Sequence, residues 1–239
     1  MAVEKTAEKV AHPVVDEREA AGLEARDRVP LSSHAKWAPA ADRPDPVALL
    51  REQDATREQD LVPVRHGRMA VSPFTFYRGA ATVMAADLKD TPVAGLGVQL
   101  CGDAHLSNFG LFASPERILL FDVNDFDETL PGPFEYDVER MAASFAIAGR
   151  NNGFSKTDSN AAAQASVRAY REAMASFAQM GVMDIWYARL DEDQLRRRLG
   201  NVRGVRNGDA DFGLFQCGGV VDSVPRHPHD KAAPLEGLH

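Results

Sequence analysis

The sequence predicts an α+β fold, and three observations along the chain support this prediction. Two short apolar stretches, 97–101 and 118–123, have the length and composition of β-strands. Each of them runs directly into a polar loop. After the turn at 131–133, the apolar residues change to the three-to-four-residue spacing of helices. A small mixed centre followed by helices is an α+β layout.

Before the helical half, two segments have helical character and two have strand character. Residues 47–60 place leucines on one side of a predicted helix, and residues 80–88 form an Ala-rich apolar run that also suits a helix. The strands 97–101 and 118–123 are expected to pair with each other or to lie as neighbours. The polar sequence CGDAHLSN would then form the loop between them.

The second half of the chain predicts three helices in succession. Asp137 can cap the first, whose apolar positions recur at helical spacing. Ser155 or Thr157 can cap the second, which ends at Gly181. The third is expected over 184–199.

Composition divides the chain into three parts and limits its partners. Residues 1–46 form a charged, Pro- and Ala-rich arm that we expect to be poorly ordered, 47–199 form the catalytic region, and 200–239 form an irregular tail. The net charge of −8 argues against nucleic acid as a partner. No signal-peptide core and no run of 18 apolar residues occur, so we expect a cytoplasmic protein without a membrane partner.

Two polar clusters follow the two predicted strands, where side chains face a cleft rather than the core. The first cluster is Asp103, His105 and Asn108, and the second is Asp122, Asn124, Asp125, Asp127 and Glu128. So many acidic and amide groups repel one another unless a cation lies among them. Their oxygen atoms suit Mg²⁺, which takes one or two protein carboxylates together with phosphate oxygens.

The spacing of these residues points to phosphoryl transfer. Asn108 follows Asp103 by five residues, and Asp122 follows Asn108 by fourteen at the end of an apolar strand. The kinase route needs an Asp that accepts the hydroxyl proton, an Asn five residues later that binds metal, and an Asp after the next strand that binds the metal bridging the phosphates. We therefore predict Asp103 as the catalytic base, with Asn108 and Asp122 as metal ligands.

Three arginines before the first cluster are candidate phosphate ligands. Arg65, Arg68 and Arg78 flank the motif region, and guanidinium groups pair well with phosphate. The alternative is that they form surface or structural salt bridges to the acidic cluster. Arg78 is the strongest of the three candidates.

The sequences CGDAHLSN and LLFDVNDFDE resemble the catalytic block of the aminoglycoside phosphotransferase and choline kinase group. This resemblance implies a protein-kinase-like C-lobe with a short two-stranded catalytic segment and following helices. It also implies that His105 holds the loop by hydrogen bonds and that Asp137 braces the loop. Asp125 and Asp127 are expected to support the site or to be solvated.

A second resemblance covers roughly residues 60–190. The motifs RHGRM, SPFTFYRG, CGDAHLSNFG, FDVNDFDET and GPFEYDVERMAAS, in this order, resemble the bacterial family called domain of unknown function 2252. The reaction of that family is not established. No glycine-rich loop precedes Asp103, and none of the six lysines lies in a strand-like setting. We therefore expect an incomplete domain, whose tail after Gly200 is truncated or frame-shifted.

The function predicted from these residues is metal-dependent phosphoryl transfer from ATP to an unknown acceptor, with Mg²⁺ as the metal. One alternative is a metal-dependent phosphoesterase, because Gly102-Asp103-Ala104-His105 resembles the first motif of that class. Its downstream Gly-Asn-His block is missing, since Gly200-Asn201 is followed by Val202. The other alternative is a non-catalytic, pseudokinase-like binding protein.

Overall fold

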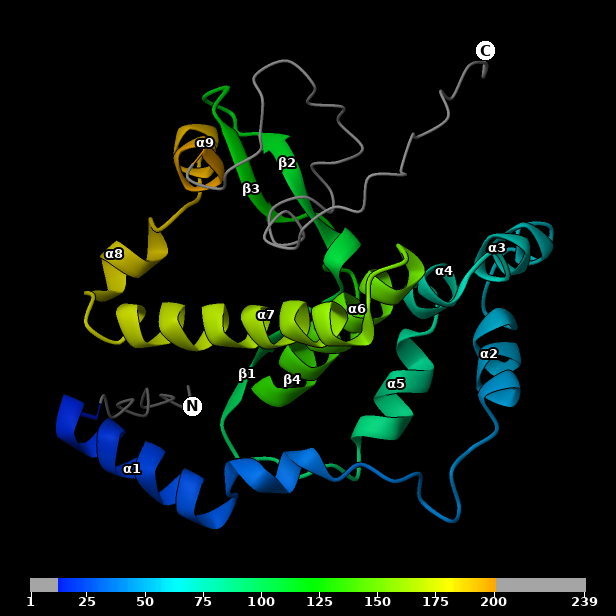
Figure 1. Ribbon diagram of the computed structural model, residues 1–239, viewed down its shortest axis with the longest axis horizontal. Helices are drawn as coiled ribbons and strands as arrows, with labels where there is room; N and C mark the ends of the chain where they lie inside the picture. The colour runs from blue at the N-terminus through cyan, green and yellow to red at the C-terminus, as the bar shows by residue number, and fades with distance from the viewer. Residues whose placement is uncertain (1–12, 201–239) are drawn as a thin grey trace, which may run out of the picture.

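A computed structural model describes residues 13–200 and confirms an α+β fold (Figure 1). The helices are α1 (Val15–Arg28), α2 (Pro46–Asp54), α3 (Val62–Met69), α4 (Pro73–Arg78), α5 (Ala81–Leu88), α6 (Phe134–Asn151), α7 (Lys156–Phe177), α8 (Val182–Trp186) and α9 (Glu192–Gly200). Two 3₁₀ turns are η1 (Leu31–Ala35) and η2 (Leu106–Asn108). The strands are β1 (Gly97–Leu100), β2 (Phe109–Ala113), β3 (Leu119–Val123) and β4 (Leu130–Pro133).

The strands pair differently from the sequence prediction. Strand β1 pairs antiparallel with β4, so that Gly97 lies opposite Pro133. Strand β3 pairs antiparallel with β2 in a hairpin that the sequence did not predict. The predicted pairing of 97–101 with 118–123 is therefore wrong. The reason is that the residues after the polar loop form strand β2 themselves, and β3 pairs with this nearer neighbour across the turn at Ser114–Arg117.

Helices α6 and α7 pack along one another in the centre of the molecule (Figure 1). The predicted cap at Asp137 is wrong, because α6 begins at Phe134 and places Asp137 in its first turn. An acidic side chain is favourable there because it faces the positive end of the helix dipole. Ser155 caps α7, and its hydroxyl accepts the N–H of Asp158. The single helix expected over 184–199 is two short helices, α8 and α9.

Two apolar clusters hold the helices together. One joins α2, α3 and α5 through Leu50, Met69 and Val83. The other joins η2, α6 and α7 through Leu106, Phe145 and Ala162. The second cluster anchors the loop that follows β1 against α6, so the core fixes the position of the candidate site.

The structure describes part of the predicted N-terminal arm and almost none of the predicted C-terminal tail. Within the predicted arm, residues 15–28 form α1 and residues 31–35 form η1. Residues 1–12 and 201–239, including nearly all of the predicted tail, lie outside the described residues. Between residues 13 and 200, no helix is both long enough and apolar enough to cross a membrane.

Candidate active site

The site is built around residues 101–108, here called the Asp103 loop, which connects β1 to β2. Three polar side chains of α6 hold this loop. Asp137, Arg140 and Ser144 follow one another at intervals of three and four residues, which places them on the same face of the helix. Each contacts a different part of the loop, so a single rigid helix determines its conformation.

Asp137 fixes the beginning of the loop. Its carboxylate accepts the backbone N–H of Cys101 at 2.7 Å and that of Gly102 at 3.2 Å. Gly102 has a φ of +84°, and a Cβ added there would lie 2.0 Å from the backbone oxygen of Glu128. Only glycine fits this position without strain, because it has no side chain and tolerates positive φ.

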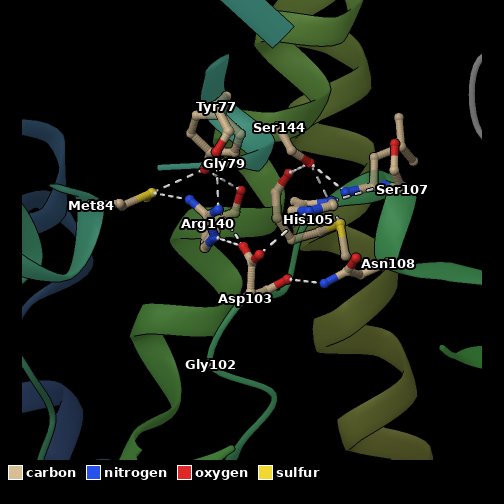
Figure 2. Close-up of polar contacts among 12 residues, drawn as sticks. Tyr77, Gly79, Met84, Gly102, Asp103, His105, Ser107, Asn108, Arg140 and Ser144 are labelled. Carbon is tan, nitrogen blue, oxygen red and sulfur yellow. Dashed lines mark hydrogen bonds and ion pairs between the residues drawn. The ribbon is translucent and has the colours of Figure 1, made fainter. Parts of the chain in front are cut away.

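Arg140 binds the Asp103 carboxylate inside the protein (Figure 2). Its Nε donates to Asp103 Oδ1 at 2.5 Å, and its Nη2 also contacts Oδ1. Arg140 is 2% exposed and Asp103 is 8% exposed. Because charge-assisted hydrogen bonds are strong and a lone buried charge is costly, the two residues stabilise each other.

The rest of the loop is held by neutral hydrogen bonds (Figure 2). The Ser144 hydroxyl accepts the N–H of Leu106 at 3.0 Å, and the Asn108 amide donates to the backbone oxygen of Asp103 at 2.9 Å. His105 Nδ1 accepts the N–H of Ser107, and its Nε2 lies 3.5 Å from Asp103 Oδ2. Burial lowers the pKa of His105 to about 4, so the imidazole is neutral at neutral pH.

A cleft of about 880 Å³ opens beside this loop and collects most of the predicted site residues. Those that line it are Arg65, Arg68, Arg78, Asp103, His105, Asn108, Asp125 and Asp127. Asp122 and Asp137 do not line it. Segments more than 60 residues apart in the sequence, from Arg65 to Asp127, therefore meet at one cavity large enough for a small-molecule ligand.

The three arginines reach the cleft from α3 and α4. Arg65 is half-buried, and its Nη2 donates to the backbone oxygen of Gly79 at 2.7 Å. Burial and the nearby charge of Arg57 lower the pKa of its guanidinium, and nearby acidic groups partly offset this. Arg68 and Arg78 are exposed, and neither forms an ion pair within residues 13–200. These two cations therefore face the cleft without a counter-ion among the described residues.

Acidic side chains reach the cleft from the β3–β4 connection. Asp125, Asp127 and Glu128 are exposed and line the cavity. A hydrogen bond with Asp127 raises the pKa of Asp125, and partial burial together with the charge of Asp103 raises the pKa of Glu128. The charges of neighbouring carboxylates add to both shifts, and a cation in the cleft would offset this smaller repulsive part.

Asp122 lies apart from this group. It is exposed, it lies opposite Gly110 in the β2–β3 hairpin, and its carboxylate accepts the N–H of Val123. The two predicted metal ligands, Asn108 and Asp122, therefore do not line the same cavity. Among the described residues, no three His, Cys, Asp or Glu side chains are arranged to hold a metal ion.

The donor set fits a magnesium ion that arrives with phosphate. Such an ion keeps several waters and takes only one or two protein carboxylates, so it needs no preformed protein cage. Asp125, Asp127 and Asn108 offer oxygen atoms at the cleft, and the unpaired Arg68 and Arg78 offer donors for phosphate. The residues thus fit a metal–phosphate complex better than a free metal ion.

The sequence prediction missed Arg140 and Ser144. An arginine in a helix usually lies on the solvated face, and its partner Asp103 is 37 residues away. The signal that could have found both residues is the spacing Asp137, Arg140, Ser144, which places them on the face of α6 that also carries Phe145 and Ala148.

Fold and cleft together define an α+β protein with an arginine- and carboxylate-lined cavity beside a helix-braced loop. The family model described as "Uncharacterized protein conserved in bacteria (DUF2252)" matches residues 57–206, and the chain therefore belongs to this family. The matched segment contains the whole cleft except for Gln53 and Thr56. No curated protein and no solved structure matches the chain.

Proposed function

We propose that this protein is a metal-dependent phosphotransferase with a kinase-like catalytic lobe, which transfers a phosphoryl group from ATP to a hydroxyl or amine acceptor in the cytoplasm. The observation that carries the proposal is the composition of the cleft. The cleft is lined by the buried aspartate Asp103, by exposed arginines and by several exposed carboxylates that could bind a metal ion. Positioning and charge stabilisation, rather than covalent chemistry, are what phosphoryl transfer requires.

Asp103 is proposed to orient the acceptor. Its Oδ1 is engaged by Arg140, whereas Oδ2 has only the 3.5 Å approach of His105 Nε2. An acceptor hydroxyl in the cleft would donate to Oδ2 and pass its proton to that atom as the new P–O bond forms to the γ-phosphorus. The bond between that phosphorus and the β–γ bridging oxygen would break in the same step, and ADP would leave with the bond's electron pair. Because His105 is neutral, Arg140 is the only one of these two neighbours that carries a positive charge next to the Asp103 carboxylate.

The phosphates are proposed to lie against Arg78 and Arg68, with Arg65 as a partly buried third donor. Asp125, Asp127 and Asn108 would hold the Mg²⁺. When bound, this ion would neutralise the negative charge that develops on the phosphate. Asp122 would join these ligands only if the hairpin moved toward the cleft.

The test is turnover of γ-labelled ATP with Mg²⁺ by the purified chain, with water or added alcohols and amines as acceptors. We expect release or transfer of label above background, and a loss of at least about a hundredfold in Asp103→Asn. Asp90→Asn, an exposed carboxylate on the surface pair with Lys89, is the matched control and should behave as wild type. Equal turnover by wild type and Asp103→Asn would contradict the role of Asp103.

The metal ligands are distinguished by the Mg²⁺ concentration needed for half-maximal turnover. Asp127→Ala should raise that concentration by about tenfold, whereas Asp122→Ala should leave it nearly unchanged if the acidic loop holds the ion. The reverse result would assign the metal to Asp122, as the spacing in the sequence predicts.

The second candidate is a non-catalytic nucleotide-binding protein, and the Arg140–Asp103 ion pair favours it. The guanidinium occupies Oδ1 of the Asp103 carboxylate, so that oxygen atom is not free to accept a proton from an acceptor. This candidate predicts Mg-ATP binding without turnover in the wild-type chain. The phosphoesterase alternative has less support, because Asp103 and His105 are already engaged by Arg140 and Ser107 rather than open to a metal pair.

A further inference from the structure

We propose that Arg140 is a positioning residue that joins Asp103 and the anion-binding end of α4 into one rigid unit. This inference deepens the proposed function and rests on it for the identity of the anion. Arg140 does not line the cleft, so any effect on ligand binding must act through the residues that it holds.

The contacts of Arg140 extend in two directions from α6 (Figure 2). Toward the Asp103 loop, Nε and Nη2 bind Asp103 Oδ1. Toward α4, Nη2 also donates to the backbone oxygen of Tyr77 at 3.1 Å. One guanidinium group therefore bridges the predicted base and the last turn of α4.

The aromatic ring of Tyr77 strengthens the second half of this bridge. The Arg140 guanidinium lies 4.5 Å from the centre of the Tyr77 ring, which is cation–π geometry. The Tyr77 hydroxyl donates back to the backbone oxygen of Arg140 at 2.7 Å. Burial raises the pKa of Tyr77 above its ordinary value, so this hydroxyl remains protonated and keeps donating.

The residue after Tyr77 is Arg78, which ends α4 and faces the cleft without an ion-pair partner in the described chain. Fixing the Tyr77 backbone oxygen and ring thus fixes the base of the Arg78 side chain. Because Asp103 is bound by the same guanidinium, the distance between the anion-binding cation and the predicted base is set by Arg140. A lysine at this position would keep the charge but could not bridge both partners, because it lacks the planar fork.

The test uses inorganic pyrophosphate as the probe, titrated calorimetrically into the full chain, so that it does not depend on turnover. Arg140→Lys preserves charge, and we expect it to weaken pyrophosphate binding by about tenfold. Arg150→Lys, an exposed arginine at the other end of α6, should bind as wild type. Ser159→Ala removes a buried hydrogen bond in α7, away from the cleft, and serves as the control for lost stability alone.

A weaker affinity in Arg140→Lys, with unchanged affinity in a Ser159→Ala protein of equal or lower melting temperature, supports the positioning role. Wild-type affinity in a folded Arg140→Lys protein overturns it, and so does an equal loss in both variants. Absence of pyrophosphate binding by the wild type also overturns it, because there would be no anion site to position. Pyrophosphate binding that depends on Arg140 without any turnover of ATP would leave this inference standing and reject the phosphotransferase proposal.

Discussion

The Asp103 loop and the acidic segment 122–128 are both rich in acidic and amide groups, yet they are built in opposite ways. In the loop, Asp103, His105 and Asn108 are buried and hydrogen-bonded. In the segment, Asp125 and Asp127 are exposed, and a hydrogen bond with Asp127 raises the pKa of Asp125. The loop is held in place by buried contacts, whereas the segment presents exposed carboxylates to the cleft. Acidic residues that look alike in the sequence are therefore packed differently. We call the loop the fixed part and the segment the adaptable part of the candidate site.

The most direct way to break the fixed part is Gly102→Ala. The new Cβ would collide with the Glu128 backbone, and the φ of +84° would be strained, so we expect a loss of at least about 3 kcal/mol in the free energy of unfolding. Gly153→Ala is the matched control, because its φ is +80° but no atom lies within 4 Å of the added Cβ. It should cost only about 1 kcal/mol. Similar losses by urea denaturation would contradict the close contact between the loop and Glu128.

Asp137→Ala removes the brace at the start of the loop. It leaves the N–H groups of Cys101 and Gly102 without their acceptor, and we expect a loss of about 2 kcal/mol in unfolding free energy. Asp158→Ala, in the first turn of α7, is the comparison at a half-buried position whose carboxylate accepts the Ser155 hydroxyl, and it should cost less than about 1 kcal/mol. An equal loss of unfolding free energy in both variants would contradict the claim that Asp137 stabilises the start of the loop.

The buried His105 predicts how the fixed part responds to acid. Its pKa is lowered from 6.5 to about 4, so protons bind the unfolded chain more tightly than the folded one. The resulting stability is complete above pH 6.5 and is lost as the pH falls toward 4, with a slope of at most about 1.4 kcal/mol per pH unit. His105→Asn can still accept the Ser107 N–H and should flatten this part of the curve. The free energy of unfolding of both proteins would be measured by chemical denaturation between pH 4 and 7. The same pH dependence in His105→Asn as in the wild type would contradict a buried, neutral imidazole.

A substitution in the adaptable part should change the free energy of unfolding least. The pH dependence that Asp125 contributes has the opposite sign to that of His105. The pKa of Asp125 is raised, so the folded state gains stability at low pH and loses it as the pH rises through that pKa. Asp125→Asn should therefore increase stability at neutral pH by about 0.5 kcal/mol or less, because exposed charges are screened. Added salt should shrink the difference between variant and wild type. A destabilised Asp125→Asn protein would show that the carboxylate has a favourable partner.

How far the sequence could predict this protein depends on the range of each contact. Local signals worked: residues 80–88 are helical as α5, and Ser155 caps α7. Strand pairing failed, because the choice between β2 and β1 as the partner of β3 is decided by tertiary packing rather than by composition. Arg65, Arg68 and Arg78 were predicted as phosphate ligands from their residue type and their position near the motifs. All three line the cleft, and phosphate binding stays a prediction. Arg140 was missed because its charge is buried against a residue 37 positions away, which no local pattern records.

The central claim is that the cleft binds a metal-complexed nucleoside triphosphate through the arginines of α3 and α4. Calorimetric titration of Mg-ATP into the wild-type chain and into Arg78→Ala tests it most directly. Because Arg78 faces the cleft and has no ion-pair partner within residues 13–200, we predict measurable binding by the wild type and an affinity at least about tenfold lower in Arg78→Ala. Equal affinity in the two proteins, or no binding by the wild type, would contradict the claim.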